Sequence, residues 1–413
     1  MSLTVGPMPP HLESSQNPNR FLKNLPKVFF FNFSFMFMTI ISVIVPIWQS
    51  FGLTLQEVYE LQAIFGGVML VLDVPTGYLS DLFGRKSSLI VVGILNGLAF
   101  LVFSLSHTFW GFACFEVLGA TAMSLYSGCD IALLYDSLEA SGVQSNTQTN
   151  LLGKRLFYSQ IGETVASLLG GALVVYSLRW PVRVNAVLAW IPLLIALTVD
   201  EPPRKMLQTK KHFENFRFIF RSVFGHSRLL SFLFFFTIFY GFCSFAALWS
   251  LQGYWKNLGV SVPFFGVLWA GLNLIAAVSG RYAFQAERKL GPARIVLAIG
   301  ILPIIGYLGM ALFQNYWGIF LGAAFYLMRG LNSVVIQDAL NARVPNEIRA
   351  TVNSMTSLGM RGIFILLGPL MGYFLDHQGY RSTFIAVSGI IALAFFFLCV
   401  PLLRMKAEFR AQT

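Results

Sequence analysis

Several ionisable side chains stand inside long apolar runs of this chain, where a charge is costly and tends to serve a function. Carboxylates hold these positions in the first half of the sequence and guanidinium groups in the second: Asp73, Glu116, Asp130 and Glu163, then Arg329 and Arg361. A carboxylate among apolar groups can carry a proton, because desolvation favours its neutral form. An arginine there can bind an anionic substrate or a carboxylate. The residue types therefore indicate proton coupling, anion binding, or ion pairs that form and break.

The depth of these groups within their predicted helices leaves four interpretations open. At about 1.5 Å per residue, all but Glu116 lie roughly 9–12 Å from the cytoplasmic end of their helix, and Glu116 lies toward the outer side. They can form gating ion pairs, carry protons, hold an anionic substrate, or form pairs that packing locks within one group of helices. A gating or locked role is favoured for Asp73 and Asp130, which lie near polar turns. The glycines around Glu163 favour a position in a cavity instead.

The composition indicates what must position these side chains. With 413 residues, 56% hydrophobic and 11% charged, and a mean hydropathy of +0.68, the chain is too apolar for a soluble protein. Apolar runs of about 20 residues can each cross the roughly 30 Å hydrocarbon layer as helices. The predicted fold is an all-α membrane protein with twelve transmembrane helices in two groups of six: Val28–Gln49, Val58–Leu79, Ser88–Leu105, Phe109–Leu134, Arg155–Val175 and Pro181–Val199, then Leu229–Leu251, Phe264–Ala283, Ala293–Phe313, Trp317–Ile336, Val352–Leu375 and Ser382–Leu403.

Polar segments divide the chain into five predicted parts. Residues 1–20 form a flexible tail, 21–199 the first helical bundle, 200–228 a charged linker, 229–404 the second bundle and 405–413 a second tail. Most of the 29 Lys and Arg residues fall in the tails, the linker and the even-numbered connections, while the opposite loops hold Arg179, Arg183, Lys256 and Arg381. This bias follows the positive-inside rule and predicts that both termini are cytoplasmic. The net charge of +11 therefore reflects topology, and no nucleic-acid partner is expected.

A polar turn of ten residues separates the second and third apolar runs. Its two glycines let helix ends approach, its carboxylate can cap or pair, and its two cations mark a cytoplasmic face. These residues are Gly77, Asp81, Gly84, Arg85 and Lys86. The turn resembles the motif G-x-L-A-D-R-x-G-R-K between the second and third helices of the major facilitator superfamily, with Ser80 in place of Ala and Leu82 in place of Arg.

Further stretches resemble a bacterial, exporter-like branch of that superfamily. They are D-V-P-T-G at Asp73–Gly77, A-L-L-Y-D at Ala132–Asp136 and R-A-T-V-N-S at Arg349–Ser354. The fifth predicted helix keeps part of the antiporter signature G-x-x-x-G-P-x-x-G-G, with its glycines at Gly162, Gly170 and Gly171. Ala166 and Ser167 stand where Gly and Pro are expected. This departure bears on drug/proton antiport specifically and leaves the fold unaffected.

The two halves of the sequence also repeat each other. Asp136 closes the fourth predicted helix and Asp338 closes the tenth, and the same spacing along the chain separates Gly170 from Gly372. The stretch from Gly280 to Gly291 is the degraded counterpart of the opening motif. A parallel duplication of this kind is what the superfamily fold implies, namely two six-helix bundles with a substrate path between them.

The resemblance also implies a gating role for the motif turn and for the helix ends beside it. In this fold, an Asp at position 81 is expected to hold the turn against the start of the eleventh helix while the cytoplasmic side is closed. Asp136 and Asp338 are expected at the cytoplasmic ends of their helices, each beside a basic turn. Arg85 and Arg349 are their predicted partners.

The family resemblance implies a secondary transporter that moves a small molecule across the membrane by alternating access. Proton-coupled export of amphiphilic compounds is the first expectation, because of the branch resemblance, the aromatic content and the interior carboxylates. Transport of an organic anion, as uptake or export, is the alternative that Arg329 and Arg361 favour. A membrane receptor or scaffold on the same fold, without transport, is a further alternative from another class.

Other function classes are disfavoured. The nucleotide-binding pattern G-x-x-x-x-G-K-[ST] does not occur in the sequence, and no arrangement of nucleophile and base indicates an enzyme. The four cysteines lie in apolar runs without zinc-type spacing, so neither a metal nor a cofactor is expected. We expect a monomer in a bacterial inner membrane, whose partners are the lipid bilayer, protons and a small-molecule substrate.

Overall fold

A computed structural model describes residues 19–141, 148–203, 227–344 and 346–405 of the chain. These residues are almost entirely helical and contain no strand, which confirms the predicted all-α membrane fold. Nine of the described helical segments are long and apolar enough to cross a membrane. The last of them, Thr351–Arg404, continues past Gly379, where a φ of 74° bends the helix. Twelve crossings with cytoplasmic termini stay a prediction.

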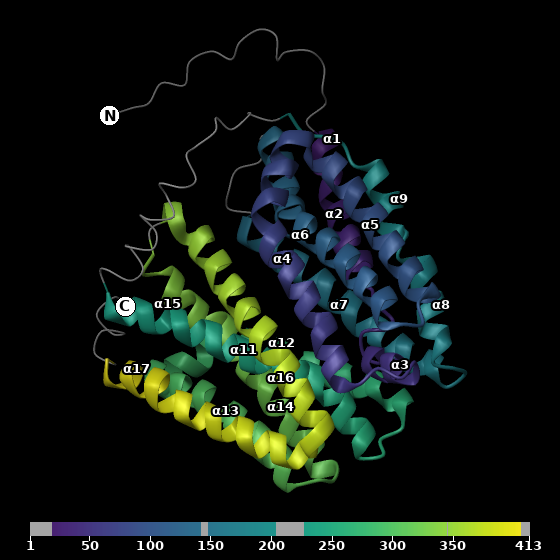
Figure 1. Cartoon of the computed structure of the whole chain (residues 1–413). Coiled ribbons are helices and arrows are strands. Elements are labelled where there is room, and N and C mark those ends of the chain that lie inside the picture. Colours follow the sequence, from purple (N-terminus) through teal and green to yellow (C-terminus); the bar gives the residue numbers. More distant parts are fainter. Residues whose placement is uncertain (1–18, 142–147, 204–226, 345, 406–413) are drawn as a thin grey trace, which may run out of the picture.

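The helices form two groups that occupy different parts of the molecule (Figure 1). The first group, from purple to teal, contains α1 Asn19–Leu22, α2 Asn24–Phe35, α3 Ile44–Ser50, α4 Leu55–Phe83, α5 Arg85–Leu105, α6 Phe109–Ala140, α7 Gln148–Val174, α8 Arg179–Leu188 and α9 Ile191–Thr198. The second group, from green to yellow, contains α11 Arg228–Asn257, α12 Phe265–Leu290, α13 Pro292–Leu312, α14 Tyr316–Leu331, the π-helical turn Asn332–Ile336, α15 Gln337–Asn341, α16 Asn346–Ala394, the π-helical turn Phe395–Cys399 and α17 Val400–Arg404.

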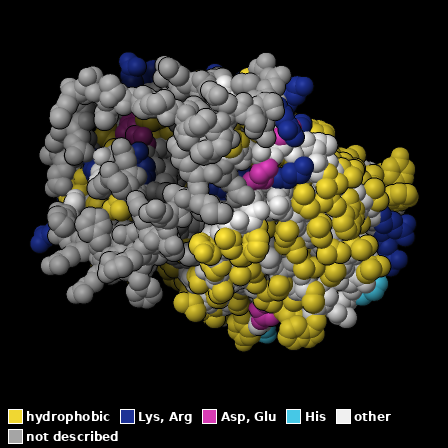
Figure 2. Space-filling view, turned by 90° about the horizontal axis from the view of Figure 1, so that it is seen from above, with side chains coloured by type: hydrophobic (Ala, Val, Ile, Leu, Met, Phe, Trp, Pro, Cys, Tyr) yellow, Lys and Arg dark blue, Asp and Glu magenta, His cyan; other side chains and the backbone are white. Residues whose placement is uncertain are grey.

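The helices end on two sides of the molecule, which we call the motif end and the opposite end. The α4–α5 turn at Gly84, the α12–α13 turn at Gly291 and the end of α6 lie at the motif end. The opposite end holds the α3–α4 turn, the α11–α12 connection and Gly379. Figure 1 shows the two groups in contact toward the opposite end and diverging toward the motif end. Viewed from above Figure 1, charged side chains surround the upper end, and hydrophobic side chains cover the flank beside it (Figure 2).

The first predicted helix, Val28–Gln49, is interrupted, and this corrects the expectation of one continuous span. Helix α2 ends at Phe35 and α3 begins at Ile44. Between them, Thr39 donates its backbone N–H to Asn185 Oδ1 and its hydroxyl to the Pro181 carbonyl at 2.8 Å. Backbone groups that leave a helix inside a membrane protein must find such partners. Helix α8 therefore stabilises the interruption. Pro46 in the first turn of α3 is its local sequence feature, because proline is tolerated where a helix begins.

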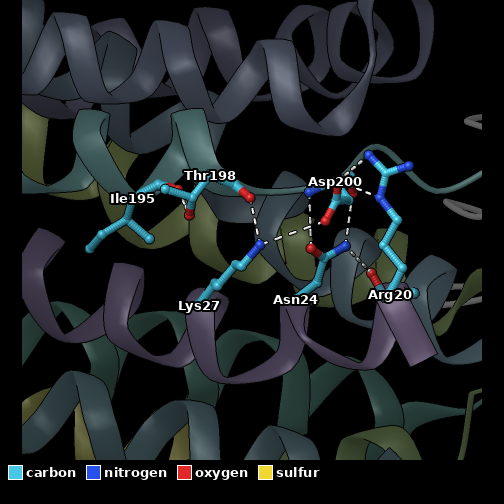
Figure 3. A network of polar contacts seen from close by, with 7 residues as sticks. Arg20, Asn24, Lys27, Ile195, Thr198 and Asp200 are labelled. Carbon is cyan, nitrogen blue, oxygen red and sulfur yellow. Dashed lines mark hydrogen bonds and ion pairs between the residues drawn. The ribbon is translucent and has the colours of Figure 1, made fainter.

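Polar contacts tie the start of the first group to its end (Figure 3). Arg20 Nε donates to Asp200 Oδ1 at 2.7 Å, and Asn24 exchanges two hydrogen bonds with the backbone of Asp200, at 2.7 and 3.0 Å. Lys27 Nζ lies 2.5 Å from the Thr198 carbonyl oxygen and 3.6 Å from Asp200 Oδ2. The Arg20 guanidinium lowers the pKa of the Asp200 carboxyl below its ordinary value. These bonds hold α1 and α2 against the end of α9.

Candidate functional site between the two helix groups

The two groups are joined mainly by α4 with α16 and by α7 with α12, and also by α3 and α4 with α11. Near the opposite end, Gln252 on α11 accepts the backbone N–H of Val45 at 3.1 Å and donates to the Ile41 carbonyl at 2.8 Å. The hydrogen bonds that join described residues of the two groups lie between this end and the level of Glu163. The described contacts therefore close the opposite end.

Glu163 lies at the boundary of the two groups. It stands on α7, and its Oε1 accepts hydrogen bonds from Trp269 Nε1 at 2.9 Å and from Asn273 Nδ2 at 3.0 Å. The two donors are four residues apart on α12 and therefore share one face of that helix. The Glu163 side chain is half-buried, whereas Trp269 and Asn273 are buried. This carboxylate thus bridges the two groups, while its predicted position in a cavity stays a prediction.

Tyr326 and Arg329 on α14 extend this site. The Arg329 guanidinium carbon lies 5.9 Å from the centre of the Tyr326 ring, a cation–π contact. The charged groups of Arg329 and Glu163 both lie within electrostatic range of the Tyr326 hydroxyl. The Tyr326 hydroxyl is buried and has no hydrogen-bond partner among the described residues. The site therefore combines one carboxylate, one guanidinium, an indole and a phenol with an unused donor.

Asp73 and Arg361 face each other across α4 and α16. The Asp73 carboxylate lies within electrostatic range of the Arg361 guanidinium. The ion pairs of the described residues do not include these two side chains. Asp73 Oδ1 and Arg361 Nε are both buried without hydrogen-bond partners there. The helices approach closely beside them, because a Cβ on Gly66 would stand 3.9 Å from Arg361 Cβ. Two opposite charges are thus available for pairing or for a ligand.

Asp130 and Glu116 lie within the first group and do not reach this boundary. Asp130 forms a buried ion pair with Arg155, whose Nη2 donates to the Tyr126 hydroxyl at 3.3 Å. Glu116 is 3% exposed and accepts a hydrogen bond of 2.8 Å from Gln62 Nε2. Both carboxylates therefore have partners inside one group of helices. Sequence reasoning placed Arg155 at a cytoplasmic helix end and missed its pairing with Asp130.

The motif turn is built around Arg85. Gly84 has a φ of 110°, a conformation that glycine adopts without strain, and this joins α4 to α5 in one residue. Arg85 Nε lies 3.2 Å from Asp136 Oδ2, which confirms the predicted pairing of these two residues. The backbone N–H groups of Arg85 and Lys86 donate to Glu201 at 2.9 and 2.6 Å. Glu201 thus caps α5, a contact that the sequence did not indicate.

The remaining motif residues are only partly described. The backbone of Asp81 lies in the last turn of α4, but its side chain is outside the described residues. Gly77 is exposed on α4. The gating role predicted for these residues stays a prediction.

The second half reproduces the turn but not the ion pair. Gly291 joins α12 to α13 with a φ of 86°, matching the place of Gly84. The predicted pairing of Asp338 with Arg349 is wrong for the described residues, because Arg349 Nε donates to the Asn341 carbonyl at 3.0 Å. Glu287 on α12 lies near Asp338 instead. The second half therefore has an acidic neighbour near Asp338, where the first half has the Arg85 cation beside Asp136.

Comparison with known proteins agrees with this architecture. A curated relative, the multidrug resistance protein MdtG of Proteus mirabilis, is 23% identical over 329 residues, which cover 76% of this chain and 78% of the relative. The crystal structure of the nucleoside transporter NupG superposes with a TM-score of 0.72 at 13% identity, covering 94% of this chain and 99% of that one. An inward-facing, unoccupied bacterial homolog of the human lysosomal transporter Spinster gives 0.72 at 18% identity, covering 94% and 98%.

A third solved structure, of a D-xylose–proton symporter, has a TM-score of 0.64 at 14% identity and covers 91% of this chain and 97% of that one. The family model described as Major Facilitator Superfamily matches residues 28–369, which include the motif turn, Glu163 and Arg361. The chain therefore belongs to the major facilitator superfamily and is a membrane transporter of small molecules, not an enzyme.

Proposed function

We propose that this transporter exports amphiphilic compounds in exchange for protons. The observation that carries the proposal is the Glu163 carboxylate, held between the two helix groups by the Trp269 indole and close to the Tyr326 ring. A half-buried carboxylate suits an amphiphile that carries a positive charge. The curated relative named as a multidrug resistance protein supports the same substrate class.

Glu163 is also placed to couple protons to the motion of the helices. Its two donors, Trp269 and Asn273, belong to the other group and stabilise the ionised carboxylate while the opposite end is closed. When the groups part at that end, α12 carries the donors away and the carboxylate takes up a proton. A proton taken up from the outer side and released at the motif end would drive export in the other direction.

Asp73 and Arg361 have a supporting role in this scheme. Their unbonded buried atoms allow the Arg361 guanidinium to neutralise Asp73 when that carboxylate is ionised. Asp73 is therefore the second candidate for proton coupling. Asp130 and Glu116 are weaker candidates, because their partners lie within one group of helices.

A second candidate function is transport of an organic anion. Arg361 Nε is buried without a partner among the described residues, and Arg329 is exposed on the α14 face beside Tyr326. Two guanidinium groups on the second helix group can bind a carboxylate or phosphate. In that case Asp73 competes with the substrate for Arg361.

The motif turn is proposed to act as the gate of the motif end. Arg85 and Asp136 stay paired in the conformation with the opposite end closed, while Asp81 is proposed to bind the start of α16 when the motif end closes. We place the protein in a bacterial inner membrane as a monomer, with the motif end in the cytoplasm.

Transport by the purified protein in proteoliposomes tests the proposal. An imposed pH gradient is expected to drive accumulation of a cationic amphiphilic dye, and dissipation of the gradient to stop it. Gradient-driven movement of an aromatic carboxylate instead of the dye would favour the organic-anion alternative. Binding of either compound in a thermal-shift measurement without any transport would favour the receptor or scaffold alternative.

A further inference from the structure

Asp376 belongs to the second helix group, yet its carboxylate is bound to the first. It stands on α16 one turn before the bend at Gly379. Its Oδ1 accepts the backbone N–H of Leu55 at 3.1 Å, and its Oδ2 accepts that of Gln56 at 2.8 Å. Both N–H groups belong to the first turn of α4, where intrahelical acceptors are lacking. The carboxylate also lies at the positive end of the α4 dipole, which stabilises an anion.

The other N–H groups of this turn find their acceptors within α4. Thr54 donates its backbone N–H to Glu57 Oε2 at 2.8 Å, and Glu57 donates its own to Thr54 Oγ1 at 3.2 Å, forming a capping box. The local sequence thus caps the N–H groups of Thr54 and Glu57, while Asp376 caps those of Leu55 and Gln56. The cap of α4 is complete only while the two helix groups are together at this end.

A glycine makes the contact possible. Gly372 lies one turn before Asp376 on α16, and a Cβ there would stand 2.7 Å from Gln56 Cα and 2.8 Å from the Leu55 carbonyl oxygen. Only a residue without a side chain lets the α16 backbone approach the start of α4 this closely. The short Asp side chain then reaches the N–H groups directly.

We propose that Asp376 is a latch that holds the opposite end of the transporter closed and releases α4 when that end opens. The latch acts as part of the transport cycle, since it joins the two groups whose separation alternating access requires. Asp81, at the other end of α4, is expected to bind the start of α16 in the alternate conformation. The α4–α16 pair then has a carboxylate contact at each end, from Asp376 at the opposite end and from Asp81 at the motif end. The two contacts form in opposite conformations of the transporter. The latch is independent of substrate and coupling ion.

Distances between spin labels in the full-length protein, with its native cysteines replaced, test this inference. One label pair, at His107 and Ser261, reports on the opposite end, and a second pair, at Lys154 and Arg288, reports on the motif end; all four side chains are exposed. Asp376→Ala is expected to change the ratio of the two conformations by about tenfold in favour of an open opposite end, because two hydrogen bonds to a charged acceptor are lost. The distance at the opposite end lengthens while that at the motif end shortens.

Two further variants separate the latch from general damage. Asp376→Asn keeps the side-chain size and one acceptor, so a smaller shift in the same direction is expected, and it replaces Asp376→Ala if the latter fails to fold. Glu57→Ala removes a carboxylate from the same helix start whose bonds stay within α4, and it should leave the ratio unchanged. Unaltered distances in the Asp376 variants, or an equal shift in Glu57→Ala, would overturn the proposal.

Discussion

Glu163 on α7 and Trp269 on α12 are joined across the two helix groups by a hydrogen bond of 2.9 Å from indole Nε1 to carboxylate Oε1. An indole N–H can only donate, so it favours an oxygen that accepts. The Asn273 amide donates to the same oxygen at 3.0 Å, which gives this oxygen two donors in the present conformation. Because both donors belong to α12, the proposed coupling would link the arrangement of the helices to the charge of Glu163.

Glu163→Gln is expected to abolish uphill accumulation driven by a pH gradient, down to the background of protein-free liposomes, and to spare downhill exchange. Binding of a cationic dye should weaken at the same time, because the carboxylate charge is lost. The amide has nearly the shape of the acid and keeps an oxygen for Trp269, but it cannot carry a proton. Dye accumulation in proteoliposomes, with and without an imposed pH gradient, measures the effect.

Glu116→Gln is the matched control for this substitution, since Glu116 is bonded to Gln62 within the first group and should not take part in coupling. If Glu163→Gln still accumulates dye in response to the gradient, Glu163 has a structural role. Asp73→Asn then becomes the variant expected to uncouple transport.

The Asp130–Arg155 ion pair is expected to support stability and not coupling. Asp130→Ala leaves the Arg155 guanidinium buried without its partner, and removal of one member of a buried pair costs roughly 3–5 kcal/mol. The unfolding temperature in detergent should therefore fall clearly. The double variant Asp130→Ala with Arg155→Ala should recover part of the loss, and a strictly additive loss would contradict the pairing.

The contact between Arg20 and Asp200 should make the unfolding free energy depend on pH in acid. The Asp200 pKa is lowered in the folded protein, mainly by its hydrogen bond to Arg20. Folding is therefore stabilised by this contact above the unfolded pKa of about 3.9, and the stabilisation is lost as the pH falls through the lower folded value. Unfolding midpoints of Asp200→Asn and the parent should differ near neutral pH and converge as the pH falls through the lowered folded pKa of Asp200. Arg20→Gln should reproduce the same profile, whereas a difference that persists in acid would contradict this assignment.

Asp81→Asn is expected to favour the conformation described here. If Asp81 binds the start of α16 only when the motif end is closed, loss of its charge destabilises the closed form and leaves the present one unaffected. Cysteine labelling from the motif side should become faster, for example at Thr351, which is exposed on α16. Labelling and transport that both match the parent would contradict a gating role.

The sequence was informative wherever a local motif or the internal repeat determined a contact. The Arg85–Asp136 pair followed from a basic turn beside a helix end, and it is present. The same reasoning failed for Asp338 and Arg349. Glu287, which belongs to the degraded second copy of the motif, lies near Asp338, while Arg349 donates to the Asn341 carbonyl.

Contacts between distant segments were beyond prediction for a physical reason. The interruption between α2 and α3 depends on Asn185, and the environment of Glu163 depends on Trp269 in the other helix group. A continuous apolar run favours a straight helix unless a remote partner accepts its backbone groups. Asp130 was expected inside its helix, but its role depends on Arg155, which only the folded chain brings close.

The close approach of α7 and α12 at the opposite end depends on Gly171 and offers a last test. A Cβ on Gly171 would stand 2.5 Å from the Pro263 carbonyl oxygen and 3.2 Å from Gly266 Cα, distances that require the backbones to separate. Gly171→Ala is therefore expected to disfavour the closed opposite end, so that the distance between spin labels at His107 and Ser261 lengthens. Gly153→Ala, on the same helix, is the control, because nothing lies within 4 Å of its added Cβ. Equal distances in the two variants would show that the contact between α7 and α12 does not limit opening.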